Sequence, residues 1–229
     1  MRPAALTAWW LRQTFVHWSY PTEEVQALLP AGLRVDDYHG RAWVGLAPFV
    51  MASVRLGGVA PLPRSTFPET NLRTYVRLPD GRSGLWFLSL EVTHPVMLAA
   101  RALGVPYHLA DLTVRVDGPL VHYAGRRRGA GASYQLTVET GPPISADEFD
   151  SWLTSRWRAF SLRAGTLWQT PVRHEPWPFA RVVLVQLQQM LTSDAGLSPP
   201  ATDPVVHYSP GVGPVGIGMP RPVAASVFG

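Results

Sequence analysis

Apolar and polar residues alternate over several short stretches of this chain, as they do in β-strands that bury one face. The clearest alternation runs from Thr70 to Leu78, and a turn at 79–81 joins it to the apolar run Leu85 to Val92 as a hairpin. Further strands are expected over residues 42–54, 112–116, 120–124, 133–139, 167–173 and 182–191, of which the last could also be helical. Residues 57–68 are rich in Pro and Gly and predict an irregular loop.

Three segments have helical signals. Pro21 to Leu29 starts with proline and two glutamates and stops at Pro30, and His94 to Leu103 has proline near its start and Gly104 past its end. The segment Ser145 to Ser161 is the longest, with a capping box expected from Ser145 and Glu148. One apolar face of this helix would hold Phe149, Trp152, Leu153, Trp157 and Phe160.

The pattern predicts a mainly β protein. Many short strands and few helices indicate a curved, barrel-like antiparallel sheet, closed or nearly closed, with two or three packed helices. No internal repeat or linker divides the chain, so we expect one domain over 1–229, with 193–229 as a Pro- and Gly-rich C-terminal segment of the same domain.

Composition narrows the classes of function. The chain is 46% apolar but only 16% charged, against about 25% in a typical soluble domain. All 20 basic residues are arginine, and the run Arg126 to Arg128 between two glycines predicts a solvated turn rather than a nucleic-acid surface. Without lysine, no side chain can form a Schiff base, and without cysteine there are no disulfides, thiolate nucleophiles or cysteine zinc sites.

Other sites and segments are not expected. No signal peptide and no apolar stretch long enough for a membrane span is evident, so we expect a cytoplasmic protein without a membrane partner. We predict no metal and no cofactor, because the spacing of His17, His94, His122 and His174 does not suit a metal.

The strand that follows Phe67 carries unusual chemistry on one face. Alternation places Glu69, Asn71, Arg73 and Tyr75 together. If this face lines a barrel interior, each group needs a partner, and a ligand could bridge the carboxylate and the guanidinium. On pattern alone, however, a solvated outer face of an antiparallel sheet explains the same alternation more simply.

A second candidate is the pair Tyr107 and His108, which follows the turn at Gly104. Tyrosine can donate or accept a proton, and histidine titrates near neutral pH. An aromatic pair at a sheet edge is the more common reason for such a dipeptide, and His17, beside Trp18, is more often a core residue than a ligand.

Six motifs in order carry a family resemblance. They are Phe15-Val-His-Trp18, Gly40-x-x-Trp43-Val-Gly-Leu, Phe67-x-Glu-x-Asn-x-Arg-Thr-Tyr-Val76, Trp86-Phe-x-Ser-Leu90, Ala100-Arg-x-x-Gly-Val-Pro-Tyr107 and His174-x-Pro-Trp177-Pro. Together they resemble the YqjF-like family of uncharacterised domains (DUF2071), over roughly Trp10 to Trp177 and weakly to Tyr208. That family is similar in fold to acetoacetate decarboxylase, which implies a large curved sheet enclosing a small-molecule pocket.

The resemblance also implies roles for single residues. Acetoacetate decarboxylases carry Gly-Phe-Pro-Lys-Lys, whose first lysine forms the Schiff base and whose second lowers the pKa of the first. The stretch Gly104-Val-Pro-Tyr107-His108 looks like this element, with Tyr107 in place of the nucleophile and His108 in place of its neighbour. Glu69 resembles a pocket glutamate of those enzymes. The resemblance therefore implies a retained pocket without imine chemistry.

We therefore expect a small-molecule pocket protein, and three roles remain open. In the first, it is a non-Schiff-base enzyme on a small organic acid or carbonyl compound, with Glu69, Tyr107 and His108 as catalytic groups. The expected substrate-binding residues are Asn71, Arg73, Tyr75, Arg101, His17 and Trp86. In the second, the same pocket binds or senses an apolar or amphipathic ligand without turnover. In the third, the polar strand only forms buried structural pairs. A homodimer is compatible with the composition.

Overall fold

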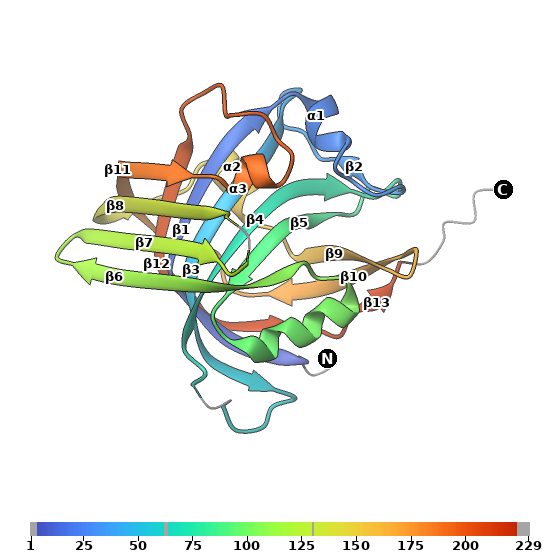
Figure 1. Ribbon diagram of the computed structural model, residues 1–229, viewed down its shortest axis with the longest axis horizontal. Helices are drawn as coiled ribbons and strands as arrows, with labels where there is room; N and C mark the ends of the chain where they lie inside the picture. The colour runs from blue at the N-terminus through green and yellow to red at the C-terminus, as the bar shows by residue number, and fades with distance from the viewer. Residues whose placement is uncertain (1–3, 62–63, 130, 224–229) are drawn as a thin grey trace.

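The computed structural model describes residues 4–61, 64–129 and 131–223, and within them the chain is mainly β (Figure 1). The strands are β1 Leu6–Tyr20, β2 Arg34–Val35, β3 Ala42–Leu56, β4 Phe67–Arg77, β5 Ser83–Val92, β6 Tyr107–Asp117, β7 Leu120–Arg127, β8 Ser133–Ile144, β9 Arg158–Arg163, β10 Thr166–Arg173, β11 Phe179–Gln189, β12 Val205–Ile217 and β13 Arg221–Pro222. The helices are α1 Thr22–Gln26, the 3₁₀-helix η1 Pro95–Leu103, α2 Glu148–Thr154 and α3 Leu191–Asp194.

Nine of the described strands close into a barrel. Their order around the ring is β4-β5-β6-β7-β8-β11-β12-β1-β3, and the pairing of β3 with β4 completes it. Most neighbours are antiparallel, but β5 and β6 run parallel because η1 forms the crossover between them. The predicted curved, barrel-like sheet is confirmed.

A second, smaller ring shares five of these strands. Strand β5 splits: its end at Leu90–Val92 pairs with β6, whereas Leu85 and Trp86 pair with β9. Strand β10 then joins β9 to the far end of β12. Figure 1 shows the two extensions on opposite sides of the molecule, with β6, β7, β8 and β11 on one side and β9, β10 and β13 on the other. Strand β4 belongs to the shared wall and therefore has a protein interior on each face.

The two faces of β4 have different characters. Leu72 lies in the main hydrophobic core of the nine-strand ring, together with Val44, Leu46, Tyr123 and Leu136. Thr70, on the same face, lies 2.5 Å from the Tyr134 hydroxyl. The opposite face carries the polar residues, and it is also buried. The solvated outer face considered for this strand is therefore wrong.

The predicted long helix at 145–161 is also wrong. Only α2, Glu148–Thr154, is helical, and its capping box is formed by Asp147 and Asp150 rather than by Ser145 and Glu148. After Thr154 the chain enters β9, where backbone hydrogen bonds to β5 and β10 outweigh the local helical pattern. Phe160, expected on a helix face, instead packs from β9 against Leu33, Val76 and Leu78.

The chain ends form strands that local periodicity does not predict. Strand β1 pairs with β12, although the segment after Thr192 carried no predicted element. The glycines of β12 serve close packing: a Cβ on Gly213 would lie 2.6 Å from the Trp9 ring. Residues 224–229, the end of the predicted 193–229 segment, lie outside the described residues.

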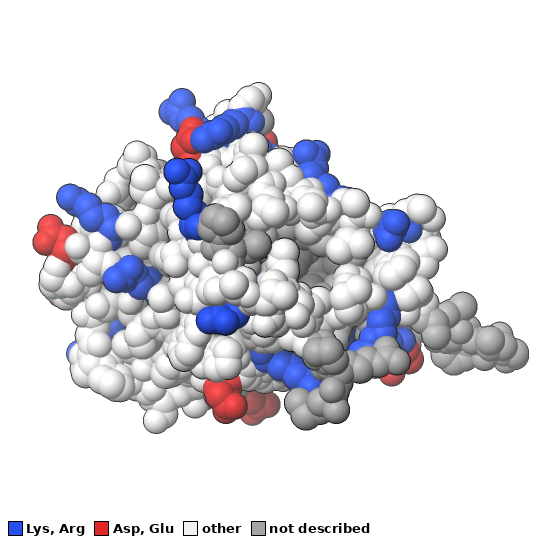
Figure 2. Space-filling model, turned by 90° about the horizontal axis from the view of Figure 1, so that it is seen from below, with Lys and Arg blue, Asp and Glu red and all other residues white. Residues whose placement is uncertain are grey.

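Charges are sparse and dispersed. Figure 2 shows arginine side chains in separate places on one face, with wide uncharged areas between them. The Arg126–Arg128 run is not simply a solvated turn, since Arg127 is buried, whereas Arg128 pairs with Asp111 at the surface. No helix in the described part of the chain is long and apolar enough to cross a membrane.

Gly104, which ends η1, is a position where glycine is required. Its φ is +79°, and a Cβ there would lie 2.1 Å from the Leu162 carbonyl oxygen. We expect Gly104→Ala to lower the free energy of unfolding by about 3 kcal/mol, because alanine is strained in the left-handed backbone conformation and its Cβ would displace β9. Gly118 is the matched control, because its φ is +55° and no heavy atom lies within 4 Å of the added Cβ. Gly118→Ala should cost only about 1–2 kcal/mol in urea unfolding, and equal costs would contradict the role of the close contact.

Candidate functional site

The polar face of β4 gathers Glu69, Asn71, Arg73 and Tyr75 inside the smaller ring, each no more than 7% exposed. The register with β3 places small residues beside two of them, Ala47 next to Asn71 and Gly45 next to Arg73. A Cβ on Gly45 would lie 2.7 Å from the His17 ring, so this glycine makes room for the histidine. The structure thus brings His17 to the face where the sequence placed the other four.

Glu69 and Tyr107 form a buried acid pair. The Tyr107 hydroxyl lies 3.3 Å from both carboxylate oxygens of Glu69. Burial raises the pKa of Glu69 to about 8. The hydrogen bond from Tyr107 lowers this pKa, and the nearby Glu91 raises it further. Burial, and then the nearby Glu69, raise the pKa of Tyr107 well above its usual value. At neutral pH both groups therefore retain their protons.

Arg73 is a buried cation without an anionic partner. Its guanidinium lies over the Phe15 ring, 5.1 Å from the centroid, and no described carboxylate lies within 4.0 Å of it. Its Nε and the neighbouring Asn71 Oδ1 are buried without hydrogen-bond partners. Each unsatisfied group costs about 1–3 kcal/mol. A purely structural role for the strand predicts that Glu69 and Arg73 are fully paired with protein groups and lie beside no cavity; Arg73 has no described anionic partner, and its Nε is unpaired.

Two histidines extend the site beyond Arg73. The Tyr75 hydroxyl donates to the Leu153 carbonyl and lies 2.7 Å from His17 Nε2. The His207 ring lies 6.0 Å from that of His17, and its Nε2 lies 2.7 Å from Asp150 Oδ1. Burial, with smaller contributions from His207 and Arg73, holds the pKa of His17 well below its usual value.

His207 and Asp150 are functional candidates that the sequence did not indicate. His207 lies on β12, within the segment for which no strand was predicted, and Asp150 lies on α2, within the predicted helix 145–161 but not among the residues singled out there. The apolar and polar residues around His207 alternate over too few positions to predict a strand. The sequence therefore does not show that the His207 side chain faces His17.

An aromatic layer covers the site. Trp177 contacts Phe15, with ring centroids 5.1 Å apart, and stacks on Trp10 at 6.0 Å. His174 contacts both tryptophans and also lines a cavity of about 690 Å³. A continuous chain of ring contacts thus runs from this cavity to Arg73. Glu69 and Arg73 line neither this cavity nor two others, of about 720 and 260 Å³.

Three predicted site residues lie elsewhere. His108 follows Tyr107 on β6, so its side chain points to the opposite side of the strand. Burial there lowers the pKa of His108, and the nearby Arg127 lowers it further. Arg101 is exposed on η1. Trp86 packs beside Phe160 and lines the cavity of about 260 Å³. The structure does not bring these three to the Glu69 carboxyl group.

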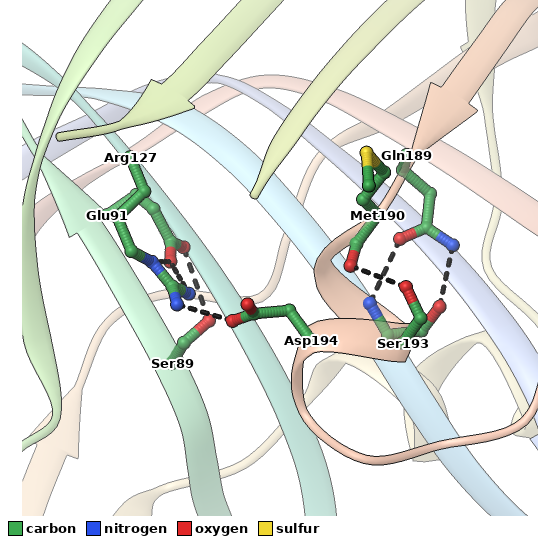
Figure 3. Close-up of polar contacts among 8 residues, drawn as sticks. Ser89, Glu91, Arg127, Gln189, Met190, Ser193 and Asp194 are labelled. Atoms are coloured by element: carbon green, nitrogen blue, oxygen red, sulfur yellow. Dashed lines mark hydrogen bonds and ion pairs between the residues drawn. The ribbon is translucent and has the colours of Figure 1, made fainter. Parts of the chain in front are cut away.

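Figure 3 shows a network of ion pairs around Arg127. It lies on the opposite face of β5 from the acid pair, because Glu91 alternates with Leu90, the residue that pairs with Tyr107. Glu91 pairs with Arg127 at 2.5 Å, and Arg127 also pairs with Asp194 of α3. Ser89 donates to the second Glu91 oxygen at 3.3 Å. Glu91 stands opposite Thr70 on β4 and His108 on β6, so this network backs the strands that carry Glu69 and Tyr107.

No cluster of three or more described His, Asp or Glu side chains could hold a metal ion. The histidines of the site contact aromatic rings, a phenol and one carboxylate instead.

Comparisons with known proteins agree with this architecture. The model of the DUF2071 family, described as an uncharacterized conserved protein, matches residues 7–213. The uncharacterized protein YqjF of Bacillus subtilis (strain 168) is 31% identical over 213 residues, which are 88% of this chain and 88% of that protein.

Solved structures show the same fold. An acetoacetate decarboxylase-like enzyme from Sphingomonas wittichii RW1 has a TM-score of 0.67 at 18% identity, covering 97% of this chain and 94% of that one. Acetoacetate decarboxylase from Legionella pneumophila has a TM-score of 0.68 at 14% identity, with coverage of 98% and 90%. The enduracididine biosynthesis enzyme MppR, complexed with pyruvate, has a TM-score of 0.70 at 14% identity, with coverage of 97% and 91%.

Proposed function

Because the chain belongs to the DUF2071 family and has the acetoacetate decarboxylase-like fold, we propose that it is an enzyme that performs acid–base chemistry on a small carboxylic acid with a carbonyl or hydroxyl group. The observation that carries the proposal is the buried Arg73, which has no described anionic partner and whose Nε has no hydrogen-bond partner, on the same strand face as the Glu69–Tyr107 pair. A fold that holds pyruvate in MppR supports a small carbonyl acid as the ligand class.

The reaction proceeds without an imine. The chain contains no lysine, and Tyr107 stands where the resemblance to acetoacetate decarboxylases places the nucleophilic amine. A phenol cannot form a Schiff base, but it can donate a hydrogen bond to a carbonyl oxygen. Hydration, dehydration, enolisation and retro-aldol cleavage are the reaction types open to such a site.

Arg73, Glu69 and Tyr107 have different roles in this proposal. Arg73 holds the carboxylate through its planar, bidentate fork of N–H donors. Glu69, kept protonated by burial, donates a proton to the substrate oxygen and, as the resulting carboxylate, accepts one from carbon. Tyr107 orients Glu69 and stabilises its charged form by hydrogen bonding. Glu69 and Arg73 are four residues apart, roughly 13 Å between their Cα atoms along the strand.

The second candidate function is ligand binding without turnover. The aromatic layer of Trp10, Phe15 and Trp177 favours it, because binding pockets are mostly apolar with a few placed polar groups. In this role Arg73 would anchor the acid group and the rings would hold an apolar or amphipathic body.

Titration calorimetry with a panel of small carboxylic acids tests the proposal. We expect Arg73→Met to weaken binding of the acids by about 10- to 100-fold, because the buried cation supplies a charge-assisted hydrogen bond. Arg77 is the matched control on the same strand: it is exposed and 3.7 Å from Asp37. Arg77→Met should bind like the wild type, and equal binding by Arg73→Met would overturn the anion site.

Exchange of substrate hydrogens in D₂O, followed by NMR, separates the two functions. Under the enzymatic proposal the wild type exchanges carbon-bound hydrogens of an acid that it binds, and Glu69→Gln binds the acid without exchange. Binding with neither exchange nor product formation in the wild type would favour the non-catalytic function.

A further inference from the structure

Several buried polar atoms in the wall that contains Phe15 have no hydrogen-bond partner. Trp10 Nε1, His17 Nδ1, Asn71 Oδ1, Arg73 Nε and His207 Nδ1 are all buried without hydrogen-bond partners. Phe15 contacts Arg73 at 5.1 Å, stacks on His17 at 6.1 Å and touches Phe179 at 6.5 Å, which in turn contacts His207. These atoms come from β1, β4 and β12, three strands of one wall. Their concentration in one wall points to a missing hydrogen-bonding partner.

The proton on His17 can be placed by counting donors. The Tyr75 hydroxyl has a single hydrogen, which it gives to the Leu153 carbonyl, an oxygen that can only accept. The contact between Tyr75 and His17 Nε2 must then be a donation from the imidazole N–H to the phenol oxygen. Because neutral imidazole carries one hydrogen, His17 Nδ1 is a bare acceptor.

The proton on His207 follows in the same way. Asp150 Oδ2 accepts the backbone N–H of Asp147, and its Oδ1 lies 2.7 Å from His207 Nε2. Burial tends to raise the pKa of Asp150, but the hydrogen bonds of His207 and of the Asp147 backbone together hold it below its ordinary value, so the carboxylate is ionised and can only accept. Nε2 therefore carries the hydrogen, and in neutral His207 the unpaired Nδ1 is a second bare acceptor.

The unpaired atoms thus require both kinds of partner. Arg73 and Trp10 offer N–H donors, which suit a carboxylate, whereas His17 Nδ1, His207 Nδ1 and Asn71 Oδ1 are acceptors that need donors on the ligand. A simple alkanoic or keto acid supplies no such donors. We infer that the site selects a hydroxy acid, whose carboxylate binds Arg73 and whose hydroxyl group donates to His207 Nδ1. The inference rests on the proposed function and narrows its substrate class.

Matched acids that differ by one hydroxyl test this selectivity. Calorimetry would compare lactate with propionate and malate with succinate. A site that hydrogen-bonds a hydroxyl should prefer the hydroxylated member by about tenfold or more. Asp150→Asn is the informative variant, because the amide oxygen can keep the Asp147 contact while the amide N–H donates to His207 Nε2. This moves the histidine hydrogen to Nδ1 and removes the acceptor without removing the ring.

We expect Asp150→Asn and His207→Phe to reduce the preference to below about threefold while the hydroxyl-free acid still binds. His122→Phe, on β7 and hydrogen-bonded to Thr137, is the control and should keep the wild-type preference. Equal binding of both members by the wild type, or a preference that survives both variants, would overturn the inference. Loss of both acids in Arg73→Met concerns the anion site alone, so the two proposals fail separately.

Discussion

Arg127→Met is expected to destabilise the folded protein by about 3–5 kcal/mol, the cost of leaving a buried charge without its partner. The arginine is 8% exposed and lies between Glu91, which is 3% exposed, and Asp194 of α3. Asp194 is 36% exposed and can be solvated, but Glu91 cannot. Burial already raises the pKa of Glu91, and Arg127 is the largest influence that lowers it. Without Arg127 the carboxyl must take up a proton or remain as an unpaired anion.

Urea unfolding followed by tryptophan fluorescence measures this cost, and the melting temperature should fall by roughly 10 °C. Arg128→Met is the matched control, since Arg128 and Asp111 are 60% and 66% exposed and such pairs contribute about 1 kcal/mol or less. The double variant Arg127→Met with Glu91→Leu should recover most of the loss, because an apolar pair of similar volume often replaces a buried ion pair without cost. Equal losses in Arg127→Met and Arg128→Met would contradict the network's structural role.

The same network shows what the sequence can and cannot reveal. Local alternation predicts β4 and its polar face, because side chains two residues apart must share a side of a strand. It does not reveal that β4 forms a wall between two interiors, since that depends on β9, β10 and β12 far along the chain. Arg127 looks like part of a solvated basic turn until β5 and α3 bring Glu91 and Asp194 to it.

The differences between the expected and the observed arrangement have the same origin. Tyr107 and His108 were expected to act together by resemblance to adjacent lysines, but neighbours on a strand face opposite sides, and only Tyr107 reaches Glu69. Residues 158–163 carry a helical pattern that sheet pairing overrides. His207 becomes part of the site only because β12 pairs with β1, nearly two hundred residues earlier in the chain.

The ionisation of Glu69 should dominate the pH dependence of stability. Burial raises the pKa of this carboxyl to about 8, from an ordinary value of 4.5. Below pH 4.5 the group is protonated in both folded and unfolded chains, so its full contribution to stability is present there. As pH rises toward 8 the unfolded state loses this proton while the folded state keeps it, and stability falls by about 3–4 kcal/mol between pH 5 and pH 8.

Glu69→Gln should remove this decline, because an amide has no proton to lose. The variant is expected to match the wild type near pH 5 and to exceed it by about 3–4 kcal/mol at pH 8 in urea unfolding. Glu139→Gln, at an exposed position on β8, should keep the wild-type pH profile. If the free energy of unfolding changed with pH in the same way in the wild type and in Glu69→Gln, Glu69 would be ionised at neutral pH. Glu69 could then not be the proton donor of the proposed mechanism. A profile flattened by Glu69→Gln alone would instead identify the one carboxyl in the site that holds a proton where the substrate needs it.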